Sequence, residues 1–210
     1  MADYSDQEQA EKLAAWWKQN GTSAITGVAI GVALLFGYRY WIQHQEQQRV
    51  EASILYEQLL ATRTQEPADA IGKANMLMNE YAGTPYAGMA GLTLARIHHD
   101  RGDRAAARSA LQWTLANARG PAVHAARLRL ARLQLEAGET EAVRALLGMK
   151  DMGGFDAEYQ ELQGDLLRVQ GQPNGARAAY REAIRRTSAD AAYLRLLTMK
   201  LDDLGPEESR

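Results

Sequence analysis

One stretch near the start of the chain has no charged residue and no side-chain amide for 18 consecutive positions. Residues 21–38 read GTSAITGVAIGVALLFGY. At a rise of about 1.5 Å per residue, a helix of this length covers roughly 27 Å, and Tyr40, Trp41 and Ile42 extend it toward the ~30 Å hydrocarbon core of a bilayer. We therefore predict a single transmembrane helix over residues 21–42. A buried core helix of a water-soluble domain is the alternative for such a segment.

The residues at both ends of this stretch favour an uncleaved membrane anchor. Trp16, Trp17 and Lys18 precede it and residues 38–41 (YRYW) follow it, as aromatic and cationic side chains do at membrane interfaces. A cleaved signal peptide is the closer competitor. Its N-terminal region carries net positive charge, whereas here the preceding residues include Asp3, Asp6, Glu8 and Glu11. The bulky residues 38–41 also stand where a small-residue cleavage site is expected.

The first twenty residues have the spacing of a short amphipathic helix. Ala10, Leu13, Ala14 and Trp17 recur at helical intervals, and the pair Asn20-Gly21 is a helix-stop signal. We predict a tail over residues 1–20 whose short helix lies at the membrane surface, with a docking helix for a soluble partner as the alternative. Two lysines before the span and two arginines after it leave the positive-inside rule nearly tied, so charge alone does not orient the anchor.

Small residues recur every four positions within the predicted span. Ser23, Gly27 and Gly31 lie on one face of a helix, where small side chains let a neighbouring helix backbone approach closely. Glycine and alanine are also simply common in transmembrane helices. We take these three residues as candidates for packing against another membrane helix.

The rest of the chain predicts a series of helical hairpins. After the span the composition shifts to Ala, Leu, Arg, Gln and Glu with almost no β-branched runs, which favours helix. Proline is common in the first turn of a helix and glycine just after its end. Residues at helix starts are Pro67, Pro85, Pro121 and Pro173, and those at helix ends are Gly83, Gly102, Gly120, Gly138 and Gly171. The helices between them are short and joined by tight turns.

The hairpins repeat with a period close to that of tetratricopeptide units. Gly102 and Gly138 are 36 residues apart, Gly138 and Gly171 are 33 apart, and the tetratricopeptide unit has about 34. No Trp occupies the first-helix position of that motif, and residues 150–155 interrupt the second helix of one repeat. We expect an all-α fold, in which a single N-terminal transmembrane helix precedes a short tetratricopeptide-like α-solenoid over residues 43–204 and a tail over 205–210. Within it we expect a divergent hairpin over residues 47–81, three repeats through Thr187 and a closing helix over 188–204.

Composition and motifs exclude several function classes. The chain has no cysteine, which excludes disulfides, cysteine-bound zinc and thiol catalysis. Its 24 Lys and Arg against 26 Asp and Glu argue against nucleic-acid binding. Residues 98–100 (HHD) resemble a metal fragment, but adjacent helical residues point apart and no second cluster follows at ligand spacing. No nucleophile elbow, zinc-protease motif or phosphate-binding loop occurs, so we expect neither an enzyme nor a bound cofactor.

The first helices of the hairpins supply the candidate partner-binding face. In the register of the repeat, the concave face collects apolar, basic and acidic side chains, of which we single out Arg96, His99, Leu128, Arg132 and Leu135. Arg96 and Arg132 occupy equivalent positions, and paired guanidinium groups among apolar side chains suit an extended peptide or a carboxylate-bearing segment. The alternative is that these arginines form a solvated face.

Three segments carry a resemblance to a known family. TPYAGMAGLTLAR, ELQGDLLRVQGQPNGARAAYREA and LLTMKLDDLG, together with the acidic tail and the early span, resemble the YfgM-like family of ancillary subunits of the bacterial SecYEG translocon. The resemblance covers nearly the whole chain. It implies a bacterial inner-membrane protein with a cytoplasmic N-terminus and a periplasmic tetratricopeptide-like domain, and it brings no catalytic residues.

The same resemblance implies the partners. They are the SecYEG translocon, a PpiD-like membrane-anchored prolyl isomerase, and periplasmic chaperones or nascent chains, beside the membrane lipid itself. The expected role is to pass translocated proteins to periplasmic chaperones. Two alternatives are a regulator that docks a cytoplasmic signalling protein through the N-terminal tail, and a cell-envelope assembly helper that uses the solenoid alone.

Overall fold

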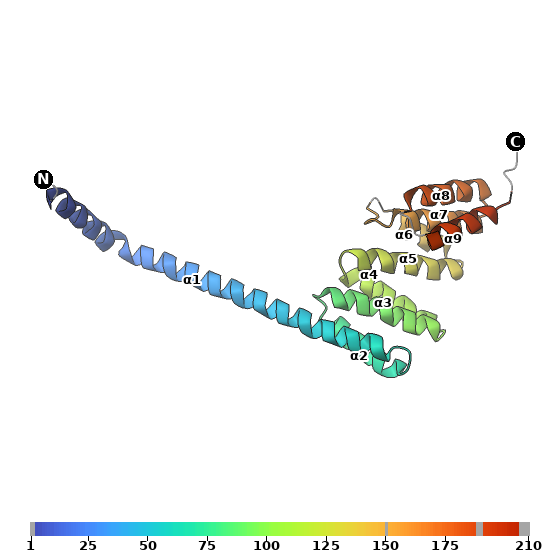
Figure 1. Ribbon diagram of the computed structural model, residues 1–210, viewed down its shortest axis with the longest axis horizontal. Helices are drawn as coiled ribbons and strands as arrows, with labels where there is room; N and C mark the ends of the chain where they lie inside the picture. Colours follow the sequence, from blue (N-terminus) through green and yellow to red (C-terminus); the bar gives the residue numbers. More distant parts are fainter. Residues whose placement is uncertain (1–2, 150, 188–190, 206–210) are drawn as a thin grey trace. The chain divides into compact units, whose positions relative to one another are not determined.

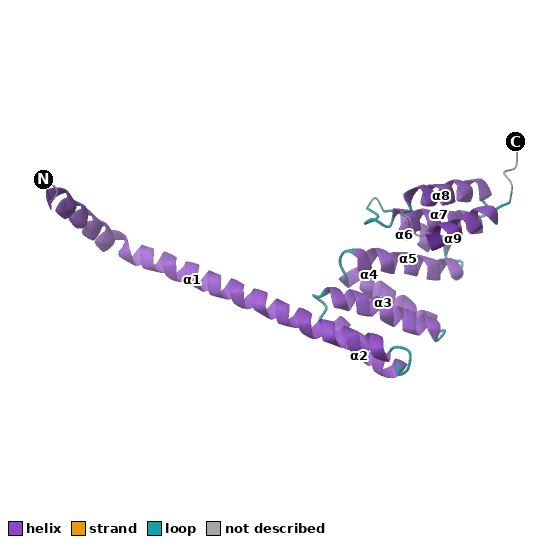
Figure 2. Ribbon diagram, viewed as in Figure 1, coloured by secondary structure: helices purple, strands orange, loops and turns teal. Residues whose placement is uncertain are grey.

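The computed structural model describes residues 3–149, 151–187 and 191–205 of the 210-residue chain. Within these ranges every regular element is a helix and no strand is present (Figure 2). The chain divides into two compact units, Met1–Val50 and Glu51–Arg210, which are described separately.

The first unit is formed by the N-terminal part of helix α1, whose full bounds are Asp3–Thr62 (Figure 1). From Ile25 onward this helix contains a window that is long and apolar enough to cross a membrane, and none of the window is buried in the protein. Leu34, Leu35 and Phe36, for example, are 65–72% exposed. Exposing these large apolar side chains to water is unfavourable, whereas the hydrocarbon core of a membrane accommodates them.

The expected helix stop at Asn20-Gly21 is wrong, because α1 continues through both residues. The Asn20 side-chain amide donates a hydrogen bond to the Trp16 carbonyl one turn back, at 3.1 Å, and so stays within the helix. Gly21 does not adopt the positive φ that ends a helix, and the Trp17 indole lies against it. Glycine and asparagine signal a stop only where the following residues do not favour helix, and here an apolar helical run follows.

The second unit contains the end of α1 and eight further helices in the described ranges. They are α2 (Pro67–Glu80), α3 (Pro85–Asp100), α4 (Arg104–Asn117), α5 (Pro121–Glu136), α6 (Thr140–Leu147), α7 (Asp156–Val169), α8 (Pro173–Arg186) and α9 (Ala191–Asp202). The four prolines predicted to start helices each stand in the first turn of one. The predicted closing helix is α9, while residues 188–190 of that prediction and residues 206–210 of the predicted tail lie outside the described residues.

Three inter-helix turns share one geometry. Gly102, Gly138 and Gly171 have φ between +71° and +79°, in the left-handed region that glycine adopts without strain. After α3, the Gly102 N–H donates to the His99 carbonyl and the Asp103 N–H to the His98 carbonyl, which satisfies the last carbonyls of the helix. The equivalent bonds follow α5 and α7. The glycine period in the sequence therefore marks equivalent turns.

From α2 onward each helix packs on the next along the chain, and the first helices of successive hairpins also pack together, α3 on α5 and α5 on α7 (Figure 1). One core cluster contains Leu59, Leu77, Leu94, Leu111 and Leu130 among its members. A second cluster contains Leu128, Val143, Tyr159, Leu162 and Leu166. This is the stacking of a solenoid, in which the apolar face of a hairpin is buried by its neighbours.

Candidate partner-binding groove

A groove of about 1140 Å³ lies among the end of α1, α3 and α5 within the second unit. Its apolar side chains include Tyr56 and Leu60 from α1 and Met89 and Leu92 from α3. Arginine side chains come from α3, from α5 and from the turn segments that follow α1 and α3, and the His99 imidazole of α3 lies among them. The arginines are Arg63, Arg96, Arg101, Arg129 and Arg132.

The structure brings together three of the five residues predicted for the partner-binding face. Arg96, His99 and Arg132 line the groove. Leu128 and Leu135 do not: Leu128 is 2% exposed in the second core cluster, and Leu135 packs against that cluster. These positions of α5 face α6 and α7, because α5 must bury one side against the next hairpin.

Internal carboxylates already neutralise both arginines that the sequence singled out. The Arg96 Nε lies 2.8 Å from both carboxylate oxygens of Asp100, one turn further along α3. Hydrogen bonding to Asp100 and the charge of that carboxylate raise the pKa of Arg96. The Arg132 guanidinium donates to Glu161 of α7 at 3.1 Å.

Arg129 was missed by sequence reasoning. It lines the groove from α5, and its guanidinium donates to the Leu92 carbonyl of α3 at a long 3.4 Å. Desolvation, and then the like charges of Arg132 and Arg96, lower the pKa of Arg129. The repeat pattern gives no signal at Arg129, because the residues at the same distance before the other two turn glycines are Thr93 and Leu162.

The groove residues of α1 were missed for a related reason. The turn after α1 has the sequence RTQE between Thr62 and Pro67 and contains no glycine, so the repeat register cannot be extended to this helix. Only the packing of α1 on the first core cluster places Tyr56 and Leu60 beside α3.

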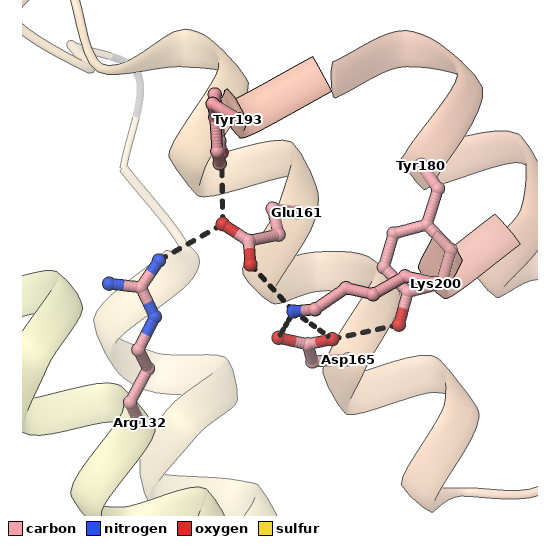
Figure 3. A network of polar contacts seen from close by, with 6 residues as sticks. All are labelled: Arg132, Glu161, Asp165, Tyr180, Tyr193 and Lys200. Atoms are coloured by element: carbon pink, nitrogen blue, oxygen red, sulfur yellow. Dashed lines mark hydrogen bonds and ion pairs between the residues drawn. The ribbon is translucent and has the colours of Figure 1, made fainter. Parts of the chain in front are cut away.

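A network of polar contacts around two buried carboxylates, Glu161 and Asp165, lies next to the groove and joins α5, α7, α8 and α9 (Figure 3). Lys200 of α9 donates to Glu161 at 2.6 Å and to both oxygens of Asp165 at 2.7–2.8 Å. The Tyr193 hydroxyl donates to Glu161 at 2.9 Å and the Tyr180 hydroxyl to Asp165 at 2.8 Å. Each carboxylate therefore has a cation and a hydroxyl as partners.

Burial and charge shift the pKa values of this network in opposite directions. Burial opposes ionisation of Glu161, but the hydrogen bond from Lys200, the charges of Arg132 and Lys200 and the Tyr193 hydroxyl outweigh it and lower the pKa. Burial and Glu161 raise the pKa of Tyr193, and burial and Asp165 raise that of Tyr180. Glu161 is thus charged and both phenols are neutral, and the network holds α9 and α5 on α7.

The small residues predicted for membrane packing lie along α1. Ser23 is exposed, and a Cβ atom added at Gly27 or Gly31 would meet nothing within 4 Å. The face they form is therefore not used by the described part of the chain.

The histidines of residues 98–100 do not form a metal-binding group with other described residues. His98 Nδ1 lies 3.8 Å from Asp103, and His99 lines the groove. Within the described ranges, no group of three or more His, Cys, Asp or Glu side chains is placed to hold a metal ion.

Comparison with known proteins confirms the resemblance read from the sequence. A protein of Escherichia coli named ancillary SecYEG translocon subunit is 28% identical over 201 residues, 95% of this chain and 97% of the relative. The proteins of the same name from Haemophilus influenzae and Aggregatibacter actinomycetemcomitans are 28% and 29% identical, over 96% of this chain and 99% of each relative. Neither these names nor the family description below denotes an enzymatic activity.

The fold class is confirmed as well. The described helices, the candidate transmembrane helix and the stacked hairpins agree with the predicted all-α arrangement. The sequence signature of the tetratricopeptide repeat-like domain matches residues 14–206, which is most of the chain. The protein therefore belongs to the tetratricopeptide repeat-like domain family.

Proposed function

We propose that this protein is a single-pass inner-membrane interaction protein that associates with the SecYEG translocon. The observation that carries the proposal is the extent of the similarity: three relatives with that name align with 95–96% of the chain, including the candidate transmembrane helix. A relative of the hairpin domain alone would not align over the apolar N-terminal segment.

The anchor and the hairpin domain have different roles in this proposal. The anchor contacts lipid and packs on translocon-associated helices through Ser23, Gly27 and Gly31, whose face is open for another helix. The hairpin domain lies in the periplasm and uses the groove at Arg96, His99 and Arg132 to bind a PpiD-like isomerase, a chaperone or an emerging chain. Passing translocated proteins to periplasmic chaperones is the resulting role.

Co-purification tests the association. The full chain, carrying an affinity tag, is solubilised from bacterial membranes in mild detergent, and the recovered SecY is quantified. Gly27→Leu combined with Gly31→Leu adds bulk to the small-residue face, so we expect SecY recovery to fall strongly. The matched control, Ile30→Leu combined with Val32→Leu, changes exposed apolar residues and should leave recovery unchanged. Equal recovery from both variants would contradict the role of the small-residue face, and no recovery with the wild type would contradict the association.

A second candidate function uses the N-terminal segment to dock a cytoplasmic signalling protein. Leu13 is 69% exposed and Trp16 is 51% exposed, so this part of α1 presents apolar side chains that the chain does not cover. Deleting residues 2–15 separates the two functions: the translocon protein keeps SecY recovery, whereas the regulator loses its signalling output. Replacing residues 21–42 by an unrelated span tests the cell-envelope helper, which would tolerate the exchange.

A further inference from the structure

The groove has an excess of positive charge that the chain does not neutralise. Five arginine side chains from the described residues line it, against two carboxylates, Asp100 and Glu136. Asp100 already pairs with Arg96. Glu136 lies 3.8 Å from Arg104, a residue that does not line the groove. Neither carboxylate is therefore left to neutralise the other arginines.

Three groove arginines have no carboxylate partner among the described residues. They are Arg63 after the end of α1, Arg101 after the end of α3, and Arg129 on α5. Within the described ranges Arg129 has only its long bond to a backbone carbonyl, and its neighbours Arg96 and Arg132 repel it. A carboxylate supplied by a ligand would remove this repulsion and form a charge-assisted hydrogen bond.

Large apolar side chains stand beside these arginines. Leu60 and Met89 are 38% and 39% exposed, and Tyr56 lines the same groove. A site with apolar walls and a few unneutralised guanidinium groups is complementary to a segment that presents apolar and acidic side chains together. It does not fit a basic or a purely apolar segment.

We propose that the groove binds an extended acidic peptide segment, with Arg129 as the central carboxylate-binding residue and Arg63 and Arg101 at the ends of the two neighbouring helices. This inference rests on the proposed function and specifies the class of partner that the groove selects. It also changes the role of Arg96 and Arg132: both already have internal partners, so they contribute positive potential rather than the main contacts.

An anionic lipid headgroup shares the carboxylate's charge, and a membrane-anchored protein has such headgroups nearby. The groove favours a peptide for two reasons. Its volume of about 1140 Å³ exceeds the typical pocket for a small molecule, ~300–1000 Å³. Its arginines also come from α3, from α5 and from the turns after α1 and α3, with apolar side chains between them, which suits a segment whose acidic and apolar side chains alternate.

Fluorescence anisotropy tests the proposal. The full chain is placed in nanodiscs of phosphatidylcholine and titrated into a fluorescein-labelled nine-residue peptide that alternates aspartate or glutamate with leucine or phenylalanine. We expect saturable binding, which Arg129→Glu weakens by at least about tenfold because a charge-assisted contact becomes a repulsion. The matched control is Arg195→Glu on the exposed face of α9, outside the groove lining, and it should leave the affinity unchanged.

Two further probes identify the chemistry of the ligand. The same peptide with asparagine and glutamine in place of its acids should bind at least about tenfold more weakly, since the charge is lost but the shape is kept. Equal binding of the neutral peptide, or equal binding by Arg129→Glu, would overturn the proposal. It would also be overturned if Arg129→Glu left peptide binding intact and instead reduced binding of the full chain, held in the same nanodiscs, to phosphatidylglycerol vesicles, which would identify a headgroup site.

Folding is checked by circular dichroism, with Arg63→Glu plus Arg101→Glu as the second variant if Arg129→Glu does not fold. Both residues are exposed, so this pair should keep the fold and still weaken peptide binding. SecY co-purification separates this inference from the proposed function. If the wild-type protein recovers SecY but does not bind the acidic peptide, only the inference fails; if SecY is not recovered, the proposed function fails whatever the peptide does.

Discussion

At the scale of single residues, the most constrained group outside the groove is the Glu161 carboxylate. It is almost fully buried, with 4% of the side chain exposed, and its charge persists because Lys200, Arg132 and the Tyr193 hydroxyl surround it. A buried ion is tolerated only when its partners offset the loss of hydration. Removing one partner should therefore cost more than removing an exposed ion pair.

Lys200→Met keeps most of the side-chain volume but removes the cation shared by Glu161 and Asp165. We expect the free energy of unfolding at pH 7 to fall by about 3 kcal/mol, as for breaking a buried pair. Urea unfolding of the full chain in detergent, followed by circular dichroism, measures it. Lys73→Met is the matched control, since Asp69 of that pair is half exposed, and it should cost less than about 0.5 kcal/mol. Equal losses would show that the network does not stabilise the domain.

The cost of Lys200→Met should also depend on pH. The folded protein holds the pKa of Glu161 below its ordinary value, so its ionic contribution is fully present above the ordinary carboxyl pKa of about 4.3 and is lost as pH falls through the folded value. Without Lys200 the pKa of Glu161 rises. The variant therefore loses less free energy of unfolding than the wild type when the pH falls. The unfolding free energies of wild type and variant should therefore converge from pH 7 toward pH 3. A difference that stays constant over this range would contradict the ionic origin.

At the scale of helices, close approach within a hairpin depends on single glycines. A Cβ atom at Gly164 of α7 would lie 2.5 Å from the Tyr180 ring of α8, and Tyr180 is completely buried. Tyr180 cannot move away freely, because its hydroxyl donates to Asp165. The α7–α8 hairpin therefore closes around glycine paired with an aromatic ring.

Gly164→Ala should destabilise the domain by about 1–3 kcal/mol, the usual cost of overpacking. Gly72→Ala is the control in the interior of α2, where an added Cβ meets nothing within 4 Å. It should stabilise the protein by about 0.5–1 kcal/mol, since alanine favours helix over glycine. Urea unfolding compares the two variants, and a shift of the same sign in both would contradict the packing argument.

At the scale of the whole molecule, the absence of cysteine makes the proposed orientation directly testable. Single cysteines at Glu8→Cys and Arg195→Cys place one thiol before the candidate span and one on α9, both at exposed positions. In intact spheroplasts, a membrane-impermeant maleimide should label Arg195→Cys at once and Glu8→Cys only after permeabilisation. The reverse pattern would place the hairpin domain in the cytoplasm and contradict its proposed periplasmic role.

Much of the fold could be predicted from the sequence because its signals are local. Proline at a first turn and glycine in a left-handed turn act through their own backbone, so Pro85, Pro121, Gly102 and Gly138 stand where predicted. The apolar run of residues 21–38 depends only on composition and length. The failed stop at Asn20-Gly21 shows the limit of such signals, since the favourable helical run around them prevailed.

The groove could be predicted only in part, because its contents depend on which residues share an inter-helix space. The repeat register placed Arg96 and Arg132 on a common face, and both line the groove. It could not show that Asp100 and Glu161 neutralise them, nor that Leu128 faces the next hairpin. Helical class, repeat period and the candidate anchor were thus determined by the sequence alone, through local backbone preference and hydropathy. Which arginines stay without a carboxylate partner was decided only by tertiary packing, because neutralisation depends on distances between side chains far apart along the chain.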